Sequence, residues 1–236
     1  MLTTVTITGA DDRVDPEDLA RLSEEFPHVE WGVLVSTSRA GTPRYPSAKW
    51  LRYLADAHRA YSMSLSAHFC GGIARSLAEG DDAACTIAEF FLAAGPFERV
   101  QLNGVFPFSR ENFANLAADL WQEVIFQANG NLQLVSAQND ARAVLSAGGR
   151  ASVLFDPSGG RGVETRLWPS PAPDVRMGYA GGIKPENVED VLKEICASGS
   201  QGSWWIDMES GVRDGEDRFD LGRVRAVLER TARFVR

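Results

Sequence analysis

Aspartate, histidine and cysteine residues occur in this sequence where apolar, strand-like runs come to an end. Asp156 follows the run 151–155 directly, and Asp207 lies near the end of another such run. His68 and Cys70 are two residues apart, so their side chains share a face if this segment is a β-strand. Carboxyl and imidazole groups at such places can transfer protons, whereas a thiol reacts only when its thiolate is stabilised. The residues therefore predict acid–base catalysis, with Asp156 and His68 as the first candidates and Cys70 as a weaker one.

Glycine-rich loops follow three strand-like runs in the second half of the chain. The loop residues of interest are Gly160 and Gly162, Gly181 and Gly182, and Ser210 and Gly211. Backbone N–H groups approach an anion closely where no Cβ intervenes, and the start of a helix favours negative charge. A helix is expected to begin at Pro185, shortly after the second loop. These loops predict a binding site for a phosphate group.

Strand-like and helical segments alternate along the whole chain. The expected strands are Thr4–Thr8, Trp31–Ser36, Tyr61–Cys70, Arg99–Asn103, Asn131–Ala137, Ala151–Asp156, Val175–Ala180 and Ser203–Met208. The expected helices are Pro16–Glu25, Ser47–Ala57, Ala88–Ala94, Asn112–Gln127, Pro185–Ala197 and Leu221–Phe234. Alternation of this kind predicts a parallel sheet, and eight strand units predict its closure. The predicted fold is α/β, a single (β/α)8 TIM barrel that spans residues 1–236.

The twofold period of a β-strand divides side chains between the inside of a barrel and the surrounding helices. The inward residues expected at the carboxyl ends of the strands include Thr8, His68, Cys70, Gln101, Asn103, Asp156, Asp207 and Glu209. Barrel enzymes hold their active sites at this end of the strands. We therefore expect Asp207 or Glu209 to support the orientation of the reacting groups. Gln101, Asn103 and Glu209 are expected to contact the substrate.

The composition excludes several classes of partner. The 236 residues carry a formal net charge of −8 with a pI near 5.0, which argues against nucleic acid and anionic membranes. No apolar run approaches the ~18 residues of a membrane span, and the N-terminus lacks signal-peptide features. The cysteines Cys70, Cys85 and Cys196 lack metal-binding spacing and are expected to be reduced thiols in a cytoplasmic protein. No metal or other cofactor is expected, and the chain is predicted to be a monomer or homodimer.

Three segments of the second half resemble phosphoribosylanthranilate (PRA) isomerases, which have a ribulose-phosphate-binding barrel. The segments Asp156–Gly162, Ala180–Asn187 and Asp207–Val212 match the family's Asp…Gly-Gly-x-Gly, Ala-Gly-Gly-x-x-Pro-Glu-Asn and Asp-x-x-Ser-Gly-Val, in the same order. The resemblance implies that Asp156 is the general acid that protonates the furanose ring oxygen. It also implies that Arg44 meets a carboxylate of the substrate, because Thr42–Tyr45 matches the family's Ser-Pro-Arg-Tyr.

Two strand ends depart from the family's pattern. The family has Lys-x-Cys-Gly in the first strand, with the cysteine as general base, whereas this chain has Thr6-Ile7-Thr8-Gly9. A threonine hydroxyl cannot act as a base at neutral pH unless another residue activates it. In the fourth strand the family's Gln-Leu-His-Gly is Gln101-Leu102-Asn103-Gly104 here. We therefore expect poor or absent PRA isomerase activity, with His68 or Cys70 as the replacement base or nucleophile.

Three functions are compatible with these residues. The leading one is an isomerase that acts on a small phosphorylated metabolite, a sugar phosphate bearing a carboxylate, by proton transfer next to a carbonyl or imine. The second is a lyase or hydrolase assisted by a divalent ion that His68, Asp207 and Glu209 would hold. The third is a barrel that binds a phosphorylated metabolite without catalysis.

Overall fold

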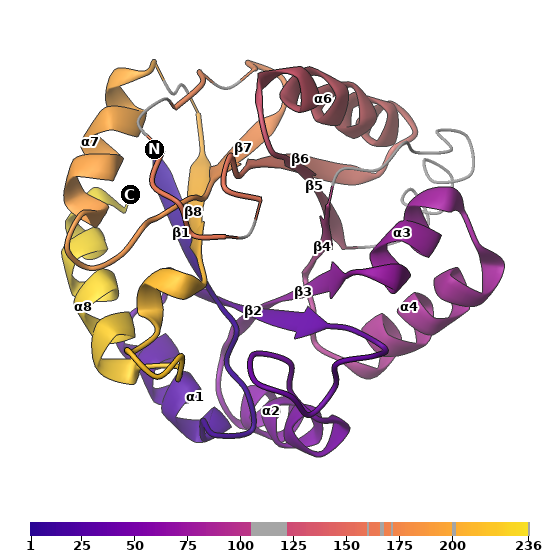
Figure 1. Cartoon of the computed structure of the whole chain (residues 1–236), viewed down its shortest axis with the longest axis vertical. Helices are drawn as coiled ribbons and strands as arrows, with labels where there is room; N and C mark the ends of the chain where they lie inside the picture. The colour runs from indigo at the N-terminus through magenta and orange to yellow at the C-terminus, as the bar shows by residue number, and fades with distance from the viewer. Residues whose placement is uncertain (105–121, 160, 166–167, 171, 200–201, 236) are drawn as a thin grey trace.

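A closed barrel of eight parallel strands forms the centre of the computed structural model, which describes residues 1–104, 122–159, 161–165, 168–170, 172–199 and 202–235 (Figure 1). The strands are β1 (Leu2–Thr8), β2 (Val29–Val35), β3 (Ser64–Cys70), β4 (Arg99–Asn103), β5 (Glu123–Ala128), β6 (Arg150–Phe155), β7 (Arg176–Tyr179) and β8 (Trp204–Met208). Each strand pairs in parallel with the next, and β8 closes the barrel on β1. The prediction of a closed (β/α)8 barrel is confirmed.

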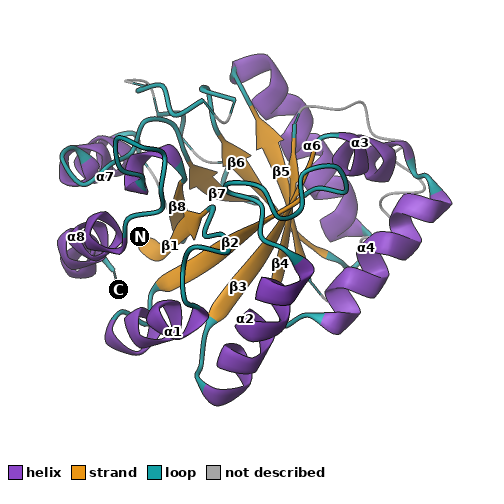
Figure 2. Cartoon of the chain, turned by 60° about the horizontal axis from the view of Figure 1, so that its bottom comes forward, coloured by secondary structure: helices purple, strands orange, loops and turns teal. Residues whose placement is uncertain are grey.

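Helices surround the ring of strands on its outer side (Figures 1 and 2). They are α1 (Pro16–Glu25), α2 (Ala48–Ala60), α3 (Gly72–Glu79), α4 (Asp82–Ala94), α6 (Asn131–Ser146), α7 (Val188–Ala197) and α8 (Leu221–Thr231), with short 3-10 turns η1 (Ser210–Val212) and η2 (Ala232–Phe234). Outward strand residues such as Val5, Ile7 and Leu65 are buried in the apolar core with the inner faces of these helices. None of the helices described is long and apolar enough to cross a membrane.

The predicted elements around the fifth strand were wrong. The segment Asn131–Ala137, predicted as a strand, is the start of helix α6, and the end of the predicted helix Asn112–Gln127 is strand β5. Residues 112–121 lie outside the described part of the chain. The apolar residues Leu132 and Val135 suggested a buried strand, but their side chains are 87% and 58% exposed. Strand β5 has three consecutive apolar residues, Val124–Phe126, so its pattern lacks the strict alternation that would have distinguished it from a helix.

Smaller differences concern the ends of helices. Two helices, α3 and α4, join β3 to β4, where the sequence indicated only the short piece Ala88–Ala94. Helix α7 begins at Val188 instead of Pro185, because the chain first forms a turn in which the N–H of Asn187 bonds to the carbonyl of Lys184. The remaining strands lie within a few residues of their predicted bounds.

Charged side chains fill the inside of the barrel at the amino ends of the strands. Arg99 pairs with Glu30 at 3.0 Å and with Glu123 at 3.4 Å, and Arg176 pairs with Glu123 at 3.3 Å. The guanidinium groups of Arg99 and Arg176 lie 4.1 and 4.9 Å from the centre of the Trp205 ring. This layer of ions and indole, which we call the barrel floor, closes the barrel below the carboxyl ends of the strands.

Candidate active site

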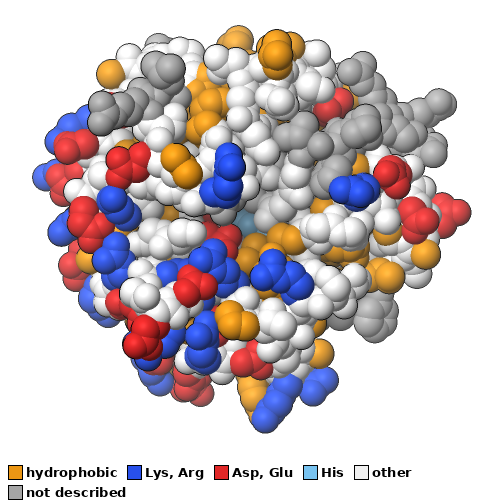
Figure 3. All heavy atoms as spheres, viewed as in Figure 1, with side chains coloured by type: hydrophobic (Ala, Val, Ile, Leu, Met, Phe, Trp, Pro, Cys, Tyr) orange, Lys and Arg blue, Asp and Glu red, His pale blue; other side chains and the backbone are white. Residues whose placement is uncertain are grey.

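A pocket opens at the carboxyl ends of the strands, and Figure 3 shows a hollow in the middle of this face with a histidine and acidic side chains at its bottom. The lining residues described are His68, Gln101, Asn103, Gln127, Leu154, Asp156, Gly162, Ala180, Gly181, Gly182, Ile183, Asp207, Met208, Glu209, Ser210 and Gly211. Eleven of these residues were predicted from the sequence as site residues. The pocket therefore gathers residues that are far apart in the chain.

Three predicted residues lie next to the pocket without lining it: Thr8, Arg44 and Cys70. Gln127 lines the pocket and was missed, because its segment was interpreted as a helix on the outside of the barrel. The other predicted residue, Gly160, lies outside the described part of the chain.

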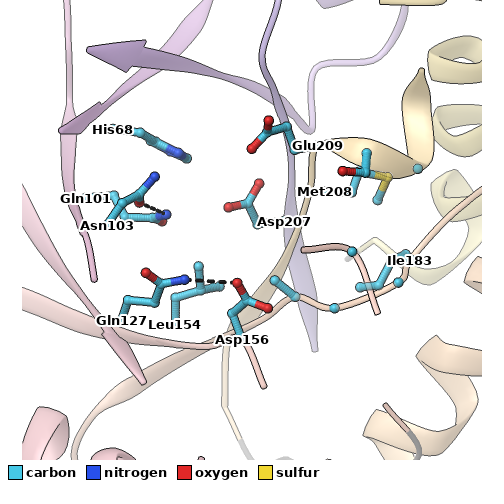
Figure 4. Close-up of a pocket in the computed structure, with 16 residues that line it drawn as sticks. His68, Gln101, Asn103, Gln127, Leu154, Asp156, Ile183, Asp207, Met208 and Glu209 are labelled. Carbon is cyan, nitrogen blue, oxygen red and sulfur yellow. Dashed lines mark hydrogen bonds between the residues drawn. The ribbon is translucent and has the colours of Figure 1, made fainter. Parts of the chain in front are cut away.

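Carboxylates and amides dominate the polar lining of the pocket (Figure 4). The acidic side chains are those of Asp156, Asp207 and Glu209, and the amides are those of Gln101, Asn103 and Gln127. No Lys or Arg is among the described lining residues. The described lining can therefore bind a negatively charged ligand group only through uncharged donors, such as backbone N–H groups and amide side chains.

Asp207 has the environment of a proton-transfer group. Its carboxyl group is buried and accepts a hydrogen bond from the Thr8 hydroxyl, with 2.8 Å between the oxygens. The pKa of Asp207 is raised to about 7, first by burial of the carboxyl group and then by nearby carboxylates, chiefly Glu209; the hydrogen bond from Thr8 acts in the opposite direction. A carboxyl group that titrates near neutral pH can both accept and return a proton during turnover.

Asp156 is held by donors from two elements. Gln127 Nε2 donates to one carboxylate oxygen at 2.9 Å, and the hydroxyl and backbone N–H of Ser158 donate to the other at 2.6 and 3.1 Å. The Ser158 contacts arise because the chain turns sharply after β6, where Pro157 and glycines follow the strand. The carboxylate of Asp156 is thereby oriented at the edge of the pocket.

His68 lines the pocket as a neutral imidazole. Its Nε2 lies 3.0 Å from the hydroxyl of Ser66 on the same strand. Burial and the positive charge of Arg99 lower the pKa of His68 to about 3. An imidazole with so low a pKa is a weak base at neutral pH, so this environment gives no support to the expectation that His68 is the general base.

Space for Thr8 and His68 depends on a glycine between them. A Cβ on Gly32 of β2 would lie 2.2 Å from Thr8 Oγ1 and 2.9 Å from His68 Cε1. Such distances are far below ordinary contact, so a larger residue at position 32 would displace both side chains.

Cys70 is a buried thiol. The thiol donates a hydrogen bond to the carbonyl oxygen of His68 at 3.4 Å, and its sulfur accepts one from Asn103 Nδ2 at 3.1 Å. Burial raises the pKa of Cys70 to about 11. The thiolate is therefore scarce at neutral pH, and Cys70 is poorly suited to act as the replacement nucleophile.

The glycine-rich loops form one side of the pocket and pack closely on one another. Gly181 and Gly182 have positive φ angles of +117° and +66°, and their N–H groups bond to no other residue that the structure describes. The N–H of Gly162, by contrast, is taken by Ser158 Oγ at 3.2 Å. Unpartnered N–H groups at the edge of a pocket are available to an anion.

Asn187 fixes the second loop in front of helix α7. Its side chain donates to the carbonyl of Gly182 at 2.9 Å and accepts from the N–H of Lys184 at 2.9 Å. Helix α7 therefore begins a few residues after this loop. Ile183 lines the pocket, whereas no residue of α7 is among the described lining residues.

Gly211→Ala is expected to weaken the binding of inorganic phosphate or ribose 5-phosphate about tenfold. A Cβ at this position would lie 1.9 Å from the carbonyl oxygen of Ile183, so the β7 and β8 loops would have to separate. The measurement is the dissociation constant by titration calorimetry. Gly215→Ala is the matched control, because a Cβ there meets nothing within 4 Å. Equal affinity in the two variants would contradict the placement of the phosphate site.

Arg44 lies at the rim with its guanidinium already paired. One end contacts Glu209, and the other binds Asp217 through two contacts of 2.5 and 3.2 Å. The backbone N–H of Arg44 donates to Asp11 at 2.8 Å and holds the residue at a φ of +73°, which is unusual outside glycine. Asp11 and Asp217 follow strands at opposite ends of the chain, β1 and β8, and neither was predicted as a site residue.

The described part of the chain contains no set of metal ligands for a metal-assisted reaction. No three His, Cys, Asp or Glu side chains there are grouped so that they could hold a metal ion. The combination of His68, Asp207 and Glu209 that the second function required is therefore not such a group.

The fold and the site together define a class: parallel (β/α)8 barrels with a polar pocket at the carboxyl ends of the strands. Within it, the model of the N-(5'phosphoribosyl)anthranilate (PRA) isomerase family matches residues 96–230, more than half of the chain. The chain belongs to the PRA isomerase family, as its sequence segments suggested.

Solved structures agree on the fold. PRA isomerase from Thermus thermophilus superposes with a TM-score of 0.65 at 19% identity, covering 98% of this chain and 99% of that one. TrpF from Jonesia denitrificans gives 0.59 at 17% identity, covering 98% and 97%. A truncated 3-deoxy-D-arabino-heptulosonate 7-phosphate synthase from Thermotoga maritima gives 0.58 at 14% identity, covering 99% and 86%. No curated protein matches the chain.

Proposed function

We propose that this member of the PRA isomerase family is an aldose–ketose isomerase that acts on a small phosphorylated sugar, and that PRA itself is a poor substrate. The observation that carries the proposal is the placement of two aspartates in one pocket, Asp207 with a pKa of about 7 and Asp156 oriented by three donors. Paired carboxyl groups with different environments are suited to divide acid and base roles.

In the proposed mechanism Asp156 is the acid and Asp207 the base. Asp156 protonates the ring oxygen or the carbonyl oxygen of the substrate, as the resemblance to the family implies. The carboxylate of Asp207 removes the proton from C2, which leaves an enol or enamine. Return of a proton to C1 and loss of the hydroxyl proton at C2 then give the ketose, with no net gain or loss of atoms.

Thr8 supports Asp207 in this mechanism instead of replacing the family's cysteine as a base. Its hydroxyl donates to one carboxylate oxygen, at 2.8 Å, and fixes the direction of the group. In the same mechanism His68, neutral at working pH, and Asn103 would hydrogen-bond the sugar hydroxyls, which their position on the opposite wall of the pocket supports (Figure 4).

The loops after β6, β7 and β8 are the proposed site for the phosphate. The available N–H groups of Gly181 and Gly182 support this role, together with the close packing of Gly211 against Ile183. The carboxylate on the substrate that the resemblance implied has no comparable support, because the guanidinium of Arg44 is paired within the chain.

Hydrogen exchange in D2O tests the proposal. Ribose 5-phosphate, and the glycosylamines that it forms with simple aromatic amines, would be incubated with the protein and followed by proton NMR. We expect deuterium to enter at C2 of the aldose or at C1 of the ketose product, because Asp207 would exchange the abstracted proton with solvent. Unphosphorylated ribose is the control and should exchange far more slowly. Binding of these probes without any exchange would favour a barrel that binds phosphorylated metabolites without catalysis.

A further inference from the structure

The guanidinium group of Arg44 is fully engaged by carboxylates of the chain. Glu209 contacts Nη1, while Asp217 binds Nε and Nη2 at 3.2 and 2.5 Å. Ser210 Oγ lies a further 3.4 Å from Nη1. The side chain of Arg44 is only 24% exposed, so little of it is open to a ligand from solvent.

Of the two acidic partners, only Glu209 lines the pocket. Its side chain is 23% exposed and extends from the end of β8 beside Asp207, as Figure 4 shows, whereas that of Asp217 is 54% exposed and lies outside the lining. On the side that faces the pocket, Glu209 therefore already pairs with Arg44, the cation that the resemblance assigned to a carboxylate of the substrate.

The backbone keeps this arrangement in place. Asp11 accepts the N–H of Arg44 at 2.8 Å, and Arg213, which is buried, contacts Asp11 at 3.5 Å and Asp217 at 2.9 Å. Gly9 leaves room for the stem of Glu209, since a Cβ there would lie 3.2 Å from Glu209 Cγ. The ion pair is thus part of a connected network at the rim.

A ligand carboxylate that entered this part of the pocket would meet like charges. It would have to displace Glu209 from Arg44 and would then lie near Asp207 and the freed Glu209 carboxylate. Unpaired like charges brought together in a partly buried place are strongly unfavourable. A neutral group in the same place would leave the Arg44–Glu209 pair intact.

We propose that Glu209 is a specificity-determining residue whose carboxylate, by pairing with Arg44, makes the pocket select phosphorylated ligands that carry no carboxylate. This inference rests on the proposed function, since it takes the glycine-rich loops as the phosphate site. It names the substrate class more closely: a sugar phosphate without a carboxylate substituent.

Two stable analogues that differ in a single carboxylate test the inference. Reductive amination of ribose 5-phosphate with aniline or with 2-aminobenzoate gives secondary amines that cannot isomerise. We expect the wild-type protein to bind the aniline product at least tenfold more tightly by calorimetry. Glu209→Gln should reduce this preference about tenfold or more, mainly by tightening the binding of the 2-aminobenzoate product.

Asp217→Asn is the matched control. This substitution also removes a carboxylate that pairs with Arg44, but one that lies outside the pocket. The ratio of the affinities for the two analogues should therefore stay within about twofold of the wild-type ratio. Thermal unfolding of each variant checks that it is folded.

The possible outcomes separate the two proposals. If neither analogue binds, the phosphate site and the proposed function fail, and this inference fails with them. If both bind but the wild-type protein prefers the carboxylate, or if Glu209→Gln leaves the preference unchanged, the role of Glu209 is overturned while the proposed function stands.

Discussion

Asp207→Asn is expected to lower the rate of C2 proton exchange by about 10²–10⁴-fold, the usual contribution of general acid–base catalysis. The amide cannot accept the proton, but it can still accept the hydrogen bond from Thr8, so the pocket should keep its shape. The same substitution should leave the affinity for inorganic phosphate within a factor of about two, because the Asp207 side chain is hydrogen-bonded to Thr8 and the anion is expected to bind the backbone N–H groups of Gly181 and Gly182.

The same variant should be more stable than the wild type at pH 8. The pKa of Asp207 rises from an ordinary value of 3.8 to about 7 on folding, so the folded protein retains a proton that the unfolded chain releases. Wild-type stability therefore falls as the pH rises from about 4 to about 7, and this contribution levels off above the folded pKa. The gain in Asp207→Asn is at most roughly 4 kcal/mol at pH 8, at about 1.4 kcal/mol for each unit of pKa difference.

Urea unfolding at pH 5 and pH 8, together with the exchange assay, measures both effects. Asp217→Asn, an exposed carboxylate outside the pocket, is the control and should change neither the exchange rate nor the pH dependence appreciably. An unchanged exchange rate in Asp207→Asn would remove Asp207 from the mechanism. A stability difference that did not grow with pH would show that its carboxyl group is not protonated at neutral pH.

Wild-type protein is expected to convert PRA at least about 10²-fold less efficiently than a family member with the first-strand cysteine. Thr8 cannot supply the general base that the cysteine provides. Glu209 and Asp217 also occupy Arg44, so the carboxylate of the anthranilate part would find no free cation there. Initial rates with freshly generated PRA measure this conversion.

Thr8→Cys alone should restore little of that activity. A thiol at position 8 would be buried beside the carboxyl group of Asp207, and both burial and negative charge disfavour a thiolate. The buried Cys70 already shows the effect, since its pKa is raised to about 11. Efficient turnover of PRA by the wild type, unaffected by Asp207→Asn, would show that both the missing base and its replacement have been misread.

The sequence was sufficient to predict the barrel and much of the pocket, because both depend on short-range patterns. Strand alternation put His68, Gln101 and Asn103 on the inside, and glycine spacing marked the loops around Gly181 and Gly211. The prediction of the fifth strand was wrong because it also relied on short-range patterns. The apolar residues of β5 lack alternation, while Leu132 and Val135 at the start of α6 are apolar but exposed. Gln127 was not predicted as a site residue for this reason.

Partners and protonation states were beyond the sequence, because they depend on contacts between distant segments. Arg44 was recognised as a rim residue, but Asp217, its partner, lies 173 positions away. Burial lowers the pKa of the His68 imidazole and raises that of the Asp207 carboxyl group, which is why the proposed mechanism takes Asp207 instead of His68 as the base. Neither shift can be read from residue type or spacing.

The barrel floor also decides how molecules reach and leave the pocket. Arg99 and Arg176 stack on Trp205 at the amino end of the barrel, while the described pocket is lined from the carboxyl ends of the strands. In the proposed reaction, reactant and product would then use the same opening at the carboxyl ends of the strands. Because the proposed isomerisation leaves the phosphate unchanged, a departing product would still bind the glycine-rich loops and would compete with the next reactant for them. Accumulated product would then slow the protein in proportion to its own affinity, without any separate regulatory site.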